Sequence, residues 1–278
     1  MTFIQGLIAR LKTPEGLFVA LGLFFGLILL FLIPPLQTPD ENVHFLRAYQ
    51  VAQGQLVSSN DDNKSGGYLP RSIQKTFDEV DGAQSISFHP ELKYDLHRTK
   101  SAMSIPLDQS DQRYYNITAA AAYSPIGYIP QSLAITLGRI LNLPPIYHIY
   151  IARLAVLLTW IAIFTFAIRC MPYKKWALVG VALLPMMVAQ SVSIGVDAVS
   201  ISTGVLFLSL ILRSMTHALR GRTLIAIIVS ASVMVLSKQI AVIFLPLIFL
   251  VAGTQFKTKV SATQAKILVT LIPFILLV

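Results

Sequence analysis

The chain has 278 residues, of which 55% are hydrophobic and only 13% are charged. A soluble globular domain carries about 25% charged residues, so the composition excludes an ordinary soluble enzyme and indicates a multi-pass α-helical membrane protein. The net charge of +9 does not indicate a nucleic-acid partner, because Lys and Arg fall mainly in short links between apolar runs, as in cytoplasmic loops that face anionic lipid.

The N-terminal region predicts an anchor in the membrane. Residues 1–15 are expected to form a cytoplasmic lead-in, and residues 16–36 form the first predicted span. Arg10 and Lys12 precede this span and therefore place the N-terminus inside. The apolar run is longer than the core of a signal peptide, and prolines rather than small residues follow it. We therefore expect the anchor to stay uncleaved.

Residues 37–145 are the extended polar region and are expected to be an extracytoplasmic loop. Its first part, residues 38–54, predicts an interfacial helix. Thr38 is a good N-cap, and Glu41 completes a capping box three residues later. Gly54 is expected to end this helix.

The rest of the loop has a less regular pattern. Residues 68–115 mix charges and aromatic residues without a clean period, so we assign no structure to them. Residues 123–143 are long enough to span, but Pro125, Pro130 and Arg139 interrupt the run. This polarity favours a helix that lies on or dips into the membrane surface, with a crossing helix as the alternative.

Residues 146–278 complete a single, all-α membrane domain of about seven spans. The remaining predicted spans are 146–168, 176–190, 196–212, 223–237, 240–253 and 268 onward. Basic residues gather in every second link, which is the pattern of cytoplasmic loops. The chain stops within an apolar run, so we expect residues 1–278 to be a truncated piece of a longer protein.

Three candidate catalytic residues follow the first span directly: Asp40, Glu41 and His44. On a helix, Asp40, His44 and Arg47 would share one face. A carboxylate beside an imidazole at a membrane surface can serve as a general base or a metal ligand. The structural alternative is that acids in a first helical turn are favoured by the helix dipole, and that Glu41 only closes the capping box.

Further candidates lie beside the later spans. An acid at membrane depth is costly, so Asp197, at the outer end of the span 196–212, is a functional candidate. An N-cap is its structural alternative. The predicted topology places Asp197 on the same side of the membrane as Asp40. Three basic residues could bind a lipid phosphate: Lys238, Arg153 and Arg139. The structural alternative for Lys238 is a side chain that snorkels to the membrane surface.

Several short motifs occur in one order along the chain: Pro39-Asp40-Glu41-x-x-His44, Tyr123-Ser-Pro-x-x-Tyr128, Ala152-Arg153-Leu154, Leu184-Pro185, Asp197-Ala198 and Ser237-Lys238. Together they resemble a bacterial family of predicted membrane proteins of unknown function. That family in turn is similar to the GT-C superfamily of glycosyltransferases, which use polyprenyl-phosphate sugars. The resemblance runs from about residue 17 to the end of the chain.

The resemblance implies a GT-C-like fold and a division of roles. In that superfamily an acid just after the first span acts as a base or a metal ligand. Here this acid would be Asp40, with Glu41 beside it. A second acid in the next outer loop would be Asp197. Lys238 or Arg153 would bind the lipid phosphate. Asp40 and Asp197 could also hold a divalent cation, Mg or Mn.

The function implied is a membrane glycosyltransferase of cell-envelope polysaccharide assembly. It would move a sugar from a polyprenyl-phosphate donor to an extracytoplasmic glycan or lipid acceptor, at an active site facing outward from the cytoplasmic membrane. Its other partners would be membrane lipids. Two alternatives are a transporter or flippase of lipid-linked glycans and a non-catalytic membrane assembly partner. Charge concentrated at the ends of the spans favours the enzyme over the transporter.

Overall fold

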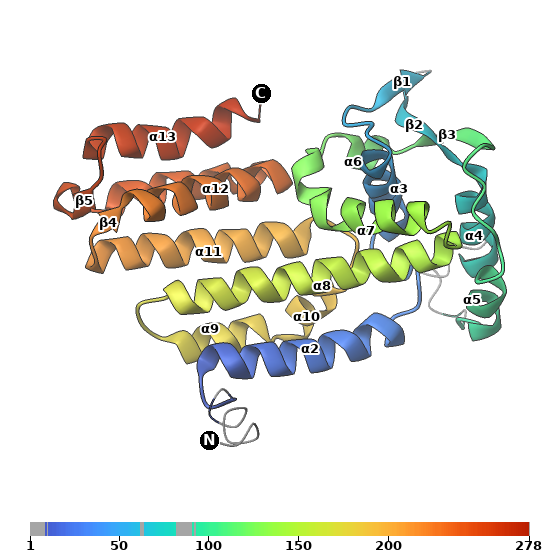
Figure 1. Ribbon diagram of the computed structural model, residues 1–278, viewed down its shortest axis with the longest axis horizontal. Coiled ribbons are helices and arrows are strands. Elements are labelled where there is room, and N and C mark those ends of the chain that lie inside the picture. The colour runs from blue at the N-terminus through green and yellow to red at the C-terminus, as the bar shows by residue number, and fades with distance from the viewer. Residues whose placement is uncertain (1–8, 10, 62–63, 82–90, 92, 278) are drawn as a thin grey trace. The chain divides into compact units, whose positions relative to one another are not determined.

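The computed structural model describes residues 9, 11–61, 64–81, 91 and 93–277 (Figure 1). Most of the predicted lead-in, residues 1–8 and 10, lies outside this set, as do residues 82–90 of the predicted loop. The chain divides into two compact units. Unit 1 holds residues 1–26, 158–191 and 197–278, and unit 2 holds residues 27–157 and 192–196.

Three helices are long and apolar enough to cross a membrane: α2 (Pro14–Leu32), α8 (Pro145–Cys170) and α11 (Asp197–Thr216). Each coincides with a predicted span. Large apolar side chains on α2 are exposed, with Phe24 at 58% and Phe31 at 71%. Lipid is the solvent that suits such a surface. The chain is therefore a mostly helical membrane protein.

The other predicted spans are shorter helices in the described part of the chain. Gly221–Ser237 forms α12, Gln239–Leu250 forms the 3-10 helix η4, and Ala262–Ile275 forms α13. The predicted span 176–190 is broken into α9 (Lys175–Ala182) and α10 (Pro185–Ser191). Pro185 explains the break, because proline disfavours helical backbone in the residue before it and lacks the N–H that an uninterrupted helix needs.

Unit 1 contains α11 and these shorter helices, together with parts of α2 and α8. Helices α11 and α12 make an antiparallel pair, and α12 also packs against α13 and η4 (Figure 1). The buried core of this bundle includes Phe207, Ile227, Val235, Ile248 and Val269. At one end, the two-residue strands β4 (Leu219–Arg220) and β5 (Phe256–Lys257) pair in parallel, beside the short helix η5 (Gly253–Gln255).

Unit 2 is centred on α3 (Glu41–Ala52) and α7 (Ile129–Ile140), which pack together. Two short helices, α6 (Thr118–Ala121) and η3 (Pro125–Tyr128), lead into α7. The core includes Phe45, Tyr49, Ile73, Tyr128 and Ile149. A helix of the length of α7 spans about 18 Å, which is less than the bilayer core of about 30 Å, so α7 does not cross by itself.

A small antiparallel sheet lies within the predicted loop, where residues 58–67 suggested a flexible link and no strand was predicted, so it departs from the all-α expectation. Its strands are β1 (Ser59–Asp61), β2 (Lys64–Pro70) and β3 (Gln112–Asn116), in the order β1-β2-β3. Helices α4 (Arg71–Asp81) and α5 (Leu96–Ala102) complete the unit. A Cβ atom at Gly66 would lie 2.0 Å from the carbonyl oxygen of Tyr115, so this close strand pairing requires glycine.

Candidate functional site

An ion pair inside unit 2 holds the link between α2 and α3. Glu41 on α3 and Arg153 on α8 both have fully buried side chains. Arg153 Nε donates to Glu41 Oε1 at 2.7 Å, and Arg153 Nη2 donates to Glu41 Oε2 at 2.5 Å. This two-point contact is the strong form of a charge-assisted hydrogen bond. It neutralises a guanidinium whose burial without a partner would be costly.

The same two side chains also bind the backbone of the link. Arg153 Nη1 donates to the carbonyl of Ile33 at 2.7 Å, and Arg153 Nη2 donates to that of Pro34 at 3.0 Å. Glu41 Oε2 accepts the backbone N–H of Leu36 at 2.9 Å. Leu36 has a φ of 65°, a left-handed conformation that costs about 1–2 kcal/mol, and the contact with Glu41 offsets this cost. The pair therefore sets the path of the chain from the first span to α3.

The predicted capping box at the start of α3 is wrong. The N-cap residue is Asp40, and the helix begins at Glu41 rather than after Thr38. The hydroxyl of Thr38 lies 3.2 Å from that of Ser193 instead. The carboxylate of Glu41 is directed to Arg153, because a buried guanidinium is a stronger donor to a carboxylate than a neutral backbone N–H.

Asp40 is the exposed acid of the motif. Its backbone is left-handed, with φ 56° and ψ 14°, and its side chain makes no capping hydrogen bond to the described first turn of α3. Asp and Asn tolerate this conformation better than most residues. Strained positions of this kind cluster at functional sites. The carboxylate of Asp40 thus projects from a backbone that the Glu41–Arg153 pair holds in place.

His44 lies one turn into α3 and is half-buried. Its Nδ1 atom lies 2.6 Å from the hydroxyl oxygen of Tyr128. The imidazole centroid is 5.6 Å from the ring of Tyr123 and 5.8 Å from the ring of Tyr128. These contacts orient the imidazole beside the start of α3. Tyr123 and Tyr128 belong to the second motif of the sequence, so the structure brings the first two motifs together in unit 2.

Arg47 does not share a surface with Asp40, so the predicted common face of α3 is wrong at this position. Arg47 is 2% exposed, and it donates to Gln50 Oε1 at 2.5 Å and to the carbonyl of Leu56 at 2.9 Å. Burial lowers the pKa of its guanidinium. The prediction failed because Asp40 lies outside the helix, where the helical spacing does not apply.

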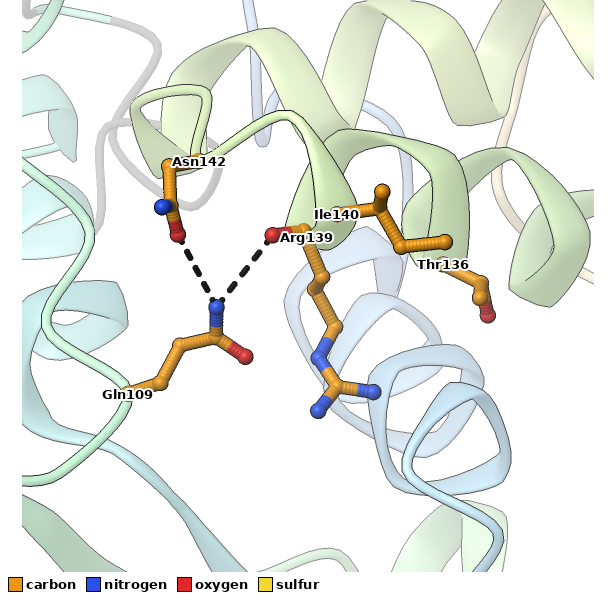
Figure 2. A pocket seen from close by; sticks show the side chains of 5 residues that line it. All are labelled: Gln109, Thr136, Arg139, Ile140 and Asn142. Atoms are coloured by element: carbon orange, nitrogen blue, oxygen red, sulfur yellow. Dashed lines mark hydrogen bonds between the residues drawn. The ribbon is translucent and has the colours of Figure 1, made fainter.

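Arg139 lines a pocket of about 360 Å³ at the C-terminal end of α7 (Figure 2). The other lining residues are Gln109, Thr136, Ile140 and Asn142. Arg139 Nη1 donates to the carbonyl of Ala52 at 2.7 Å, and the guanidinium carbon lies 5.6 Å from the ring centroid of Tyr49. Burial raises the pKa of Tyr49 to about 12, so the tyrosine stays neutral. These contacts join α7 to α3, which is a structural role beside the predicted binding role.

Asp197 and Lys238 form an ion pair within unit 1. Asp197 is the first residue of α11, where the helix dipole favours an acid. Lys238 follows α12 as its C-cap. The side chains are 30% and 39% exposed, respectively, so both groups stay accessible. The sequence predicted both residues as functional but did not predict that they pair.

The divalent cation implied by the resemblance has no cluster of ligating side chains among the described residues. No group of three or more His, Cys, Asp or Glu side chains is close enough to hold an ion in the part of the chain that the structure describes. Asp40 offers a single carboxylate there, and Asp197 is already paired with Lys238. The divalent cation therefore stays a prediction from the resemblance.

Only the fold showed that Glu41 and Arg153 belong together, because 112 residues separate them in the sequence. The available signal was an arginine inside an apolar run, which requires a buried acidic partner or polar lining. Glu41 was one of the few acids in the sequence that could have been such a partner for Arg153.

A family model described as "Predicted membrane protein (DUF2142)" matches residues 23–278. No curated protein and no solved structure matches the chain. The match covers most of the sequence and includes the buried Glu41–Arg153 pair, the exposed Asp40 and the Asp197–Lys238 pair. The chain therefore belongs to the DUF2142 family of predicted membrane proteins.

Proposed function

We propose that the protein is a membrane glycosyltransferase of the GT-C type, with the topology of about seven spans predicted from the sequence. It would transfer a sugar from a polyprenyl-phosphate donor to an extracytoplasmic glycan or lipid acceptor. The observation that carries this proposal is the exposed Asp40 on a strained backbone directly after the first span. A base in this position can reach a substrate that approaches from the membrane surface.

In the proposed reaction, the carboxylate of Asp40 accepts the proton of an acceptor hydroxyl. The hydroxyl oxygen then attacks the anomeric carbon of the donor sugar and forms the new glycosidic bond. The bond between that carbon and the phosphate oxygen breaks, and the electron pair leaves with the polyprenyl phosphate. A positioned base of this kind typically contributes 10²–10⁴-fold to the rate.

His44 and Glu41 have supporting roles in this proposal. His44 is oriented by Tyr128 and can hold a substrate hydroxyl beside α3. Glu41 is fully engaged by Arg153 and Leu36, so it acts as a positioning residue for Asp40. Arg153 is committed in the same way, so within unit 2 Arg139 is the remaining proposed phosphate ligand. Lys238 stays a phosphate ligand predicted from the sequence.

Replacing Asp40 with Asn tests the proposal. Asn also tolerates the left-handed backbone, so Asp40→Asn should fold normally while sugar transfer falls by about 10²–10⁴-fold. The measurement is transfer of a labelled sugar from a polyprenyl-phosphate donor to acceptor in membranes that contain the protein. Asn42→Ala, a change at an exposed neighbour on α3, should keep the wild-type rate.

The products separate the transferase from its alternatives. A transferase releases free polyprenyl phosphate in step with sugar transfer, whereas a transporter or flippase releases none. If Asp40→Asn keeps full transfer activity, Asp40 is not the base. If the wild-type protein moves labelled donor across the membrane without releasing polyprenyl phosphate, the transferase proposal itself fails.

A further inference from the structure

The cations of unit 1 are distributed unevenly along its helices. The sequence from residue 198 to residue 278 contains no Asp or Glu, although it contains seven Lys and Arg residues: Arg213, Arg220, Arg222, Lys238, Lys257, Lys259 and Lys266. Lys238 pairs with Asp197. The others lie in or beside the links that join α11 to α12 and η4 to α13. Acids in this stretch of the chain therefore cannot neutralise them.

The pairing of β4 with β5 places two of these cations side by side. Arg220 and Lys257 are register partners in the parallel pair, and neighbouring strands lie about 4.8 Å apart. The preceding partners, Leu219 and Phe256, pack in the core of unit 1. Because side chains alternate along a strand, Arg220 and Lys257 face outward, and both are exposed. Like charges on adjacent strands repel, so an anion between them would stabilise the pairing.

The position of this pair along the helices indicates the kind of anion. Helix α11 runs for 20 residues from Asp197 to Thr216 and is apolar enough to span a membrane, which corresponds to about 30 Å. β4 begins three residues after the end of α11. In a bilayer spanned by α11, the β4–β5 pair would therefore lie at the level of the lipid headgroups, at the opposite end of α11 from Asp197.

The contacts of Lys266 also indicate that this end of unit 1 lies at the level of the lipid headgroups. Its Nζ atom lies 5.7 Å from the ring centroid of Phe249 and 5.8 Å from that of Phe256. It also donates to the carbonyl of Phe249 at 3.4 Å. Apolar side chains of α12 and η4, the elements that α13 packs against, are exposed, with Ile225 at 62% and Leu250 at 60%. A lysine extended along aromatic rings beside exposed apolar surface is the arrangement of a side chain at the interface between hydrocarbon and water.

We propose that Arg220, Arg222, Lys257 and Lys259, here called the β4–β5 cation cluster, bind the phosphodiester headgroup of an anionic membrane lipid. Arg220 and Lys257 would hold the phosphate from two sides, and Arg222 and Lys259 would add to the local positive potential. Exposed apolar helices beside the cluster favour a bilayer over a soluble polyanion. This inference does not depend on the transferase proposal, because it uses only unit 1 and involves no reaction.

The test uses the purified full chain in a neutral detergent. Titration with phosphatidylglycerol should raise the Tm of the wild-type protein more than titration with phosphatidylcholine does. Each cation near an anionic surface contributes about 1 kcal/mol, so Arg220→Gln with Lys257→Gln should weaken the apparent affinity for phosphatidylglycerol by about thirtyfold. The matched control is Lys64→Gln with Lys75→Gln, two exposed lysines of unit 2, which should keep the wild-type affinity.

Two results would overturn the proposal. One is an unchanged preference for phosphatidylglycerol in the double variant. The other is an equal rise in Tm with inorganic phosphate, which would indicate a general anion site rather than a lipid site. If the double variant does not fold, Arg222→Gln with Lys259→Gln provides the same comparison outside the strand pair, with a weaker affinity for phosphatidylglycerol again expected and an unchanged one counting against the cluster.

Discussion

Asp40 and Glu41 are adjacent acids with opposite environments. Glu41 is fully buried and neutralised by Arg153, whereas Asp40 is exposed on a left-handed backbone. The difference follows from the link they terminate, since the buried pair binds backbone groups of Ile33, Pro34 and Leu36. One carboxylate therefore shapes the link, and the other is available for chemistry.

This division of roles predicts different stability effects for two similar changes. Glu41→Gln removes the charge that neutralises Arg153 and should cost about 3–5 kcal/mol of unfolding free energy, because breaking a buried pair leaves an uncompensated charge. Asp40→Asn should leave stability nearly unchanged. The measurement is the Tm of each purified variant in the same detergent. Equal Tm values for the two variants would show that the buried pair does not hold the fold.

The pair of Asp197 and Lys238 predicts a competition for phosphate. Asp197→Asn removes the internal partner of Lys238 and should therefore tighten the binding of polyprenyl phosphate. A partly exposed pair is worth about 0.2–1 kcal/mol, which corresponds to about a 1.5- to 5-fold gain in affinity. The control is the double change Asp197→Asn with Lys238→Gln, which should lose the gain. Weaker binding by Asp197→Asn alone would mean that Asp197 itself supports the ligand.

At the scale of elements, the contact between α7 and α8 depends on a small residue. A Cβ atom at Gly138 would lie 2.6 Å from Cδ2 and 2.8 Å from Nε2 of His148. His148 is fully buried and stacks on Tyr49, with ring centroids 5.8 Å apart. The imidazole therefore has little room to move away.

Gly138→Ala should accordingly destabilise unit 2 by about 1–3 kcal/mol, as overpacking in a filled core does. Gly180 on α9 is a matched control, because a Cβ atom there meets nothing within 4 Å. Gly180→Ala should be neutral or stabilising by up to about 1 kcal/mol. Thermal unfolding of both variants measures the difference. A Gly138→Ala variant as stable as wild type would mean that α7 and α8 can separate without cost.

Element boundaries show where local signals were sufficient and where they were not. Pro185 is a local signal, and it could have predicted the break between α9 and α10. The start of α3 could not be predicted in this way, because the partner that draws Glu41 away from a capping box comes from α8. The sheet was missed because its glycines lower the apparent strand preference of β2.

At the scale of the whole molecule, the chain combines helices long enough to span a membrane with a unit that contains a small sheet and a buried ion pair. The family match and the three long apolar helices establish a membrane protein. The buried core of unit 2 comes from residues of the predicted outer loop together with the start of α8 and residues 194 and 196. The described part of the predicted loop therefore contributes to a packed core rather than simply connecting two spans.

The sequence by itself determined the membrane class, the main spanning helices and the residues worth testing. Hydropathy and charge are sums over neighbouring residues, so they can be read without a fold. The tertiary structure decided which charges meet. It paired Glu41 with Arg153 and Asp197 with Lys238, and it left Asp40 exposed. Those outcomes depend on contacts between distant segments, where burial makes a neutralising partner far more important than local helix preference.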